Sequence, residues 1–144
     1  MKRRWLWLCI VLLVCNVAFI WGNSAMPGDV SKMISGFARD LLLLLLGGGG
    51  EQASMGDGLL RKMAHFLEFA SLGFLFFWLY SMLKKPWFYS ACCGVAVACV
   101  DETIQLFSPG RASRITDVLL DSAGMACGMA ALWLCVTIYQ KKKK

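Results

Sequence analysis

Charge is scarce in this sequence. Asp, Glu, Lys and Arg make up 17% of the 144 residues, and apolar residues make up 58%. Soluble domains carry roughly 25% charged and about 45–50% apolar residues, so this composition excludes an ordinary soluble domain. It predicts an all-α integral membrane protein that forms one domain over residues 1–144.

Histidine occurs once, and no two cysteines have the C-x-x-C spacing of a zinc site. An odd number of cysteines, all within apolar stretches, also excludes a disulfide framework. His65 with Glu68, Asp101 and Asp121 could ligate a divalent metal, but one histidine and four nearby basic residues make this the weaker interpretation. We therefore expect neither a metal nor a cofactor, and we interpret the cysteines as small apolar residues packed between helices. They are Cys9, Cys15, Cys92, Cys93, Cys99, Cys127 and Cys135.

The sequence also lacks a basic face with interleaved aromatic residues outside its apolar stretches. This excludes nucleic-acid binding despite the net charge of +6. Basic residues gather instead at the two ends, at 2–4 and 141–144. Basic ends beside apolar spans are typical of cytoplasmic anchoring, so the first expected partner is membrane lipid.

Four apolar stretches are long enough to cross a bilayer, which requires about 17–25 residues. They predict a four-helix transmembrane bundle with spans at about 5–21, 63–83, 86–107 and 115–139. The first stretch also resembles a secretory signal peptide, but its 17 residues exceed the usual ~7–15 of a signal core. We expect it to remain as an uncleaved anchor.

The longest polar connection, 22–62, contains five apolar residues at helical spacing. This pattern predicts a short amphipathic helix on the membrane surface. A hinge is expected to follow at Gly47–Gly50, because four glycines cannot sustain a helix. The apolar residues of the expected helix are Met33, Ile34, Phe37, Leu41 and Leu44.

Four spans place both termini on one side of the membrane. Nine basic residues lie on that side, counting the Lys84-Lys85 turn, against six on the other. The positive-inside rule therefore predicts cytoplasmic termini in the cell membrane. The connection 22–62 and the turn 108–110 then face outward.

Acidic residues enter three spans at one depth. Glu68 lies six residues beyond Lys62, Asp101 six before Phe107 and Asp121 six after Ile115. Each is therefore ~9 Å into its helix at about 1.5 Å per residue. A charge near the middle of a membrane costs roughly 2.5–3.5 kcal/mol on insertion scales, so such residues pair, line a cavity or perform chemistry. These acids and their polar neighbours are called the polar seam below.

The polar seam is expected to face the bundle interior, where Gly124 and Gly128 supply a GxxxG helix-packing contact. Asp117 fits equally well a second role, in which it complements the dipole of the helix that it begins. The candidate ligand-binding residues are Lys62, His65, Glu68, Asp101, Glu102, Gln105, Arg111, Arg114, Asp117 and Asp121.

Three functions fit this seam. In the first, Arg111 and Arg114 bind a phosphate or carboxylate of an amphiphile through bidentate hydrogen bonds. In the second, the protein is an enzyme acting on a lipid-linked substrate by acid–base chemistry, although no serine has an activating motif. In the third, the seam is only a packing network. The catalytic candidates of the second are His65, Glu68, Asp101 and Asp121; we favour binding over catalysis.

Three ordered motifs in residues 62–131 resemble the signature blocks of the VanZ-like family. They are Lys62-x-x-His65-Phe66-x-Glu68-Phe69, Asp101-Glu102-x-x-Gln105-x-Phe107-x-x-Gly110-Arg111 and Asp117-x-x-x-Asp121-x-x-Gly124-x-x-x-Gly128. The first span and the loop after it are generic.

The resemblance implies a small bacterial membrane protein of the cell envelope. The founding member of the family lowers susceptibility to the glycopeptide teicoplanin, and no reaction is known for the family. A lipid-linked envelope intermediate or a lipoglycopeptide antibiotic is therefore the expected ligand, and a role in antibiotic resistance is the expected function.

Overall fold

The computed structural model describes residues 2–45, 57–111 and 114–143. Five helices make up this part of the chain, and it contains no strand. Four of the helices are long and apolar enough to cross a membrane, which confirms the predicted all-helical membrane bundle. The helices are α1 (Lys2–Ala25), α2 (Gly28–Leu45), α3 (Asp57–Met82), α4 (Phe88–Phe107) and α5 (Ile115–Lys142).

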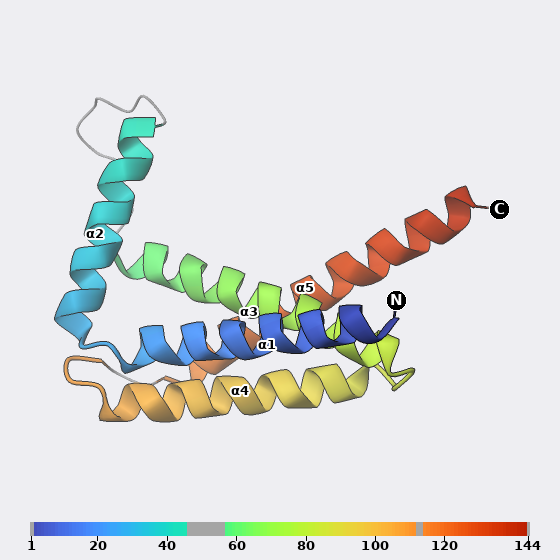
Figure 1. Cartoon of the computed structure of the whole chain (residues 1–144). Coiled ribbons are helices and arrows are strands. Elements are labelled where there is room, and N and C mark those ends of the chain that lie inside the picture. Colours follow the sequence, from blue (N-terminus) through green and yellow to red (C-terminus); the bar gives the residue numbers. More distant parts are fainter. Residues whose placement is uncertain (1, 46–56, 112–113, 144) are drawn as a thin grey trace.

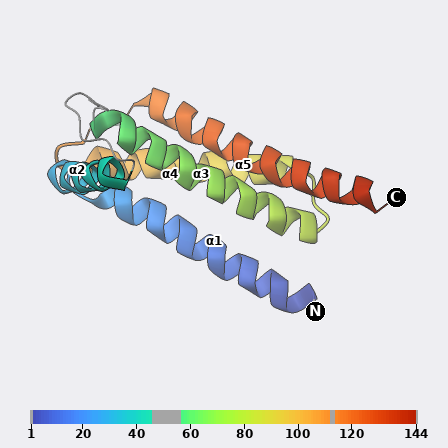
Figure 2. The same cartoon turned by 90° about the horizontal axis from the view of Figure 1, so that it is seen from above.

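The four spanning helices lie side by side, and α2 lies crosswise at one end of them (Figure 1). Both termini and the turn between α3 and α4 lie at the opposite end (Figure 1). Seen from above, α1 is at one side of the bundle, with α3 between α1 and α5 (Figure 2). The two ends of the bundle therefore differ: one carries the basic termini and the other carries α2.

The helix α2 fits the expected surface helix. It runs across the end of the bundle (Figure 1), and its apolar side chains are exposed, with Met33 at 71% and Phe37 at 72% of their accessible area. Its first residue is fixed to the turn before α5, because the Gly28 N–H donates to the Pro109 carbonyl at 2.9 Å. The side chain of Leu44 and the predicted hinge at Gly47–Gly50 lie outside the described residues.

The spanning helices extend beyond the predicted apolar stretches. The helix α1 continues through Ala25 instead of ending at residue 21, and α3 begins at Asp57 instead of near residue 63. The physical reason is that a helix does not end where its hydropathy falls; the backbone continues until a turn or a cap stops it. As a result, polar residues at the ends of α1 and α3 occupy helical positions inside the bundle.

Close contact between α3 and α5 depends on glycine. A Cβ atom placed on Gly128 would collide with the Ala70 carbonyl, and one on Gly124 would collide with the Phe66 carbonyl. The side chain of Met125, on the same helix, is buried against Gly94 of α4. Gly124 and Gly128 thus let the backbone of α5 lie directly against the backbone of α3. Met125 in turn packs α5 against α4.

Most of the cysteines face outward, which contradicts their predicted position between helices. Only Cys9 is buried, and Cys93 is intermediate. The prediction failed because a lipid-facing position in a membrane helix is as apolar as a packed one, so apolarity does not distinguish the two. The exposed cysteines are Cys15, Cys92, Cys99, Cys127 and Cys135.

We expect Gly128→Val to separate α3 from α5. The added side chain would meet the backbone of Ala70, which cannot move away without shifting the helix, and overpacking of this kind typically costs about 1–3 kcal/mol. Thermal unfolding of the purified protein in detergent measures the loss. Gly22→Val is the matched control, because nothing lies within 4 Å of a Cβ at Gly22. Equal stability of the two variants would contradict the packing argument.

Candidate functional site

Three ionisable side chains from three helices meet at the end of the bundle that carries α2. One ligand atom from each of His65 (α3), Asp101 (α4) and Asp121 (α5) can be chosen so that all three lie within 4.8 Å of one another. The two carboxyl side chains are almost fully enclosed, with 0% and 1% of the residue exposed. These three residues are called the His–Asp–Asp cluster below.

Asp101 is held from two directions. Its Oδ2 atom accepts a hydrogen bond from the Ser24 hydroxyl at 2.8 Å and one from Gln105 Nε2 at 2.9 Å. Gln105 lies four residues further along α4, which places it on the same face of the helix. The imidazole Nδ1 of His65 lies 3.9 Å from the same oxygen. The carboxyl group is therefore fixed in orientation, with Oδ2 turned to its partners.

Glu68 lies beside this cluster and not within it. The argument from equal depth grouped Glu68 with Asp101 and Asp121, but the structure brings His65, one turn earlier on α3, into that position. Equal depth does not decide which residues meet, because the rotation of α3 about its own axis also sets which side chain is directed at α4 and α5. Glu68 Oε1 instead accepts a hydrogen bond from Asn23 Nδ2 at 2.8 Å.

Arg111 caps the end of α1. Its Nε donates to the Met26 carbonyl at 3.0 Å, and its Nη2 donates to the Asn23 carbonyl at 2.7 Å. The last carbonyls of a helix have no donor within the helix and carry partial negative charge. The guanidinium supplies these carbonyls with both hydrogen-bond donors and a positive charge. Burial is the main cause that lowers the pKa of Arg111, although a guanidinium stays charged in proteins. Two of its donors are thus committed to backbone.

The outer rim of the site carries further charged residues. Lys62 Nζ lies 3.9 Å from Asp117 Oδ1. Glu102 is buried and its Oε2 accepts a hydrogen bond from the backbone N–H of Arg114 at 3.0 Å, while the Arg114 side chain is exposed. The predicted site residues therefore gather at one end of the bundle, but Arg114 contributes its backbone there.

Two small polar pockets share His65 and Arg61 in their linings. One has a volume of about 20 Å³ and also includes Asp117 and Asp121. The other has a volume of about 110 Å³ and also includes Glu68 and Arg111. His65 is therefore the member of the cluster that borders both pockets.

Several buried polar atoms around these pockets have no hydrogen-bond partner among the described residues. They include Oδ1 of Asp101, Oε2 of Glu68 and both carboxylate oxygens of Asp121, together with Nη1 of Arg111. Buried polar groups in folded proteins nearly always have a hydrogen-bond partner, and a group left without one costs about 1–3 kcal/mol. The unsatisfied atoms are mostly acceptors, so the site is suited to something that supplies donors or positive charge.

Sequence reasoning missed the part of the site that α1 supplies. Asn23 and Ser24 lie in a tetrapeptide of small and polar residues that reads as the end of a span, and nothing in their local pattern marks them as site residues. Ser108 was also missed, although it donates to the Ser24 carbonyl at 2.9 Å. Arg61 could have been included, because it directly precedes Lys62.

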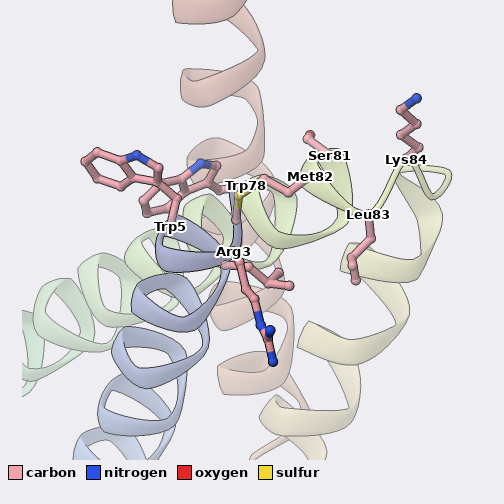
Figure 3. Close-up of a pocket in the computed structure, with 8 residues that line it drawn as sticks. Arg3, Trp5, Trp78, Ser81, Met82, Leu83 and Lys84 are labelled. Carbon is pink, nitrogen blue, oxygen red and sulfur yellow. The ribbon is translucent and has the colours of Figure 1, made fainter. Parts of the chain in front are cut away.

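A larger, mostly apolar pocket lies away from this site. It has a volume of about 720 Å³ and lies between the start of α1 and the end of α3, beside Lys84 (Figure 3). The rings of Trp5 and Trp78 are tilted against one another there, with centroids 6.4 Å apart. Tryptophan beside basic residues is typical of a membrane–water interface.

The fold and the site together define a small helical membrane protein with a buried polar cluster at one end of its bundle. The chain matches the model of the VanZ/LLP1 family over residues 7–137, and it belongs to that family. Comparison with curated proteins and with solved structures found no match. The matched region includes α1, which agrees with the contribution of Asn23 and Ser24 to the site.

We expect Arg111→Ala to destabilise the fold and Arg114→Ala to leave it nearly unchanged. Loss of the Arg111 side chain leaves the Met26 carbonyl without a donor and the Asn23 carbonyl with only the Met26 N–H at 3.3 Å, at a cost of about 1–3 kcal/mol. The Arg114 side chain is exposed, and substitution of an exposed residue usually changes the free energy of unfolding by no more than about 0.5 kcal/mol. Thermal unfolding in detergent measures both variants, and a stable Arg111→Ala protein would refute the capping role.

Proposed function

We propose that the polar end of the bundle binds the headgroup of an anionic, lipid-anchored molecule of the cell envelope. The single observation that carries this proposal is the convergence of unsatisfied buried polar atoms on two small pockets. A site that evolved only to join helices would satisfy its own hydrogen bonds. Atoms left without partners are better explained by a ligand that completes them.

Rim cations supply the charge for such a headgroup. Arg61 lines both pockets at His65 and a third pocket of about 150 Å³ with Lys32, and Lys62 lies at the smallest pocket. Arg111 keeps its Nη1 atom free of hydrogen bonds at the pocket that also contains Glu68. A phosphate or carboxylate is therefore expected at Arg61 and Lys62, with hydroxyl, amide or amine donors directed to Glu68.

An apolar groove beside the site offers a place for the lipid chain. The groove has a volume of about 690 Å³ and is lined by residues of α1, α3 and α5, including Phe19, Phe74 and Leu75. Asn16 and Ser71 stand in its wall and are hydrogen-bonded at 2.7 Å. Ser71 in turn donates to the backbone carbonyl of Glu68 at 2.7 Å. The groove and the polar pocket thus both lie along the contact between α1 and α3. An amphiphile needs such an arrangement, with an apolar site for its chain next to a polar site for its headgroup.

The other two functions are weaker on these observations. A serine nucleophile must be accessible, whereas the Ser24 hydroxyl is fully buried and already donates to Asp101. Acid–base catalysis by His65, Glu68, Asp101 or Asp121 stays a prediction. A pure packing network does not account for the unsatisfied oxygens of Asp121.

We further propose that this end faces outward and that the termini are cytoplasmic, as the positive-inside rule indicates. The ligands that fit are a polyprenyl-diphosphate-linked wall intermediate or a lipoglycopeptide antibiotic. Binding of the antibiotic by this protein in the outer leaflet would then lower the amount of antibiotic that reaches its target.

The double variant Arg61→Gln with Lys62→Gln is expected to weaken binding of a fluorescent polyprenyl diphosphate by about tenfold, since each 1.4 kcal/mol is a factor of ten. Titration of the protein in lipid nanodiscs measures the affinity. The matched control is Lys84→Gln with Lys85→Gln, which removes the same charge at the opposite end of the bundle. Equal weakening in both double variants would show that only net charge is measured and would refute the site.

A strain that lacks this protein is expected to be more susceptible to lipoglycopeptides. Expression of the wild-type chain should restore the minimum inhibitory concentration, and expression of the Arg61→Gln, Lys62→Gln variant at equal membrane abundance should not. Complete restoration by that variant would separate the phenotype from the proposed headgroup site.

A further inference from the structure

The carboxyl group of Asp121 is the least satisfied group in the described part of the chain. The residue is 1% exposed, and neither of its oxygens has a hydrogen-bond partner. An enclosed carboxylate requires a proton, a hydrogen-bond donor or a cation. None of the described cations nearby is hydrogen-bonded to Asp121: Arg111 donates to carbonyls of α1, and Lys62 pairs with Asp117. Arg61 lines the same pocket as Asp121 without a hydrogen bond to it.

We propose that the His–Asp–Asp cluster binds one divalent transition-metal ion, with Zn²⁺ as the first candidate. A nitrogen of His65 and one oxygen each of Asp101 and Asp121 lie within 4.8 Å of one another. Zinc accepts imidazole nitrogen and carboxylate oxygen at about 2.0–2.2 Å, which places tetrahedral ligands on the order of 3.3 Å apart. The three side chains close around the ion by small rotations, and its charge balances the two carboxylates.

The surroundings of the cluster match those of a metal site. Ser24 and Gln105 hold Asp101 through Oδ2 and leave Oδ1 without a partner, as outer hydrogen bonds do when they orient a ligand. The adjoining pocket of about 20 Å³ is lined by His65 and Asp121. That space is enough for one water molecule, which would complete the coordination that three protein ligands leave open.

This inference goes beyond the proposed headgroup binding and does not depend on it. The sequence predicted no metal, because one histidine stood among several basic residues. In the structure Arg111 reaches α1, Lys62 reaches Asp117, and the Arg114 side chain is exposed. Arg61 lines both pockets at His65 but makes no hydrogen bond to Asp121. What remains at the cluster is one imidazole and two carboxylates.

The test uses the full chain, purified in detergent with an affinity tag that contains no histidine. After chelator treatment, the protein is titrated with Zn²⁺ and with Co²⁺, whose visible absorption reports nitrogen and oxygen coordination. Bound metal is counted by elemental analysis. We expect one ion per chain in the wild type, with a metal-dependent rise in unfolding temperature. Absence of saturable binding to the wild type would overturn the proposal.

Variants locate the ion. Asp121→Asn and His65→Gln should each remove the bound metal and its spectrum, and Gln105→Leu should weaken binding by roughly 10–100-fold, as loss of an outer partner does. Asp29→Asn is the matched control, because it changes the same residue type at an exposed position on α2, outside both pockets at His65; it should bind normally. Equal loss in Asp29→Asn would overturn the assignment in favour of diffuse acidic binding. His65→Gln leaves both buried carboxyl groups in place. It therefore still tests the metal site if the Asp121→Asn protein does not fold.

The two proposals fail separately. Metal counting uses Zn²⁺ and Co²⁺ alone, without lipid, so its result is independent of the polyprenyl diphosphate titration. Likewise, the Arg61→Gln, Lys62→Gln variant changes no residue of the His–Asp–Asp cluster and is expected to retain one ion per chain. Loss of the ion in that variant would contradict the proposed ligand set.

Discussion

A lipid bilayer offers no hydrogen bonds, so each polar atom inside the bundle must find its partner within the protein or in a ligand. Asp101 illustrates how the chain meets this constraint. Its Oδ2 atom joins Ser24 of α1 to Gln105 of α4, with His65 of α3 only 3.9 Å away. One carboxylate oxygen thereby fixes three spanning helices relative to one another at the end of the bundle that carries α2.

The same constraint shapes the turn before α5. Carbonyls at the end of α1 would otherwise be left without donors, and Arg111 and Ser108 supply them. Pro109 accepts from the first N–H of α2, so this turn also positions the surface helix. A polar loop at the membrane surface thus has a structural task, which limits how far its charged residues are free to bind a ligand.

The Oδ2 atom of Asp101 has hydrogen-bond partners, and its Oδ1 atom has none. This difference distinguishes atoms that hold the fold together from atoms that a ligand could contact. Atoms that hold helices together are satisfied, whereas Oδ1 of Asp101, Oε2 of Glu68 and both oxygens of Asp121 are not. Of these residues, Asp121 lines one pocket at His65 and Glu68 lines the other, while Asp101 lies beside His65. A headgroup at the rim and a metal ion at the His–Asp–Asp cluster would use different atoms, so the two proposed ligands are compatible.

The amino-acid sequence by itself determined the class of protein, the four spans and the family, because hydropathy and motif spacing are local properties of the chain. It also placed the polar residues of α3, α4 and α5 at one end of the bundle. Only the tertiary structure decided which of them meet. His65 and not Glu68 joins Asp101 and Asp121, because the packing of α3 sets which of its side chains is directed at those two residues. Ser24 enters the site, and most cysteines face outward, because neighbours in space are set by helix packing and not by hydropathy.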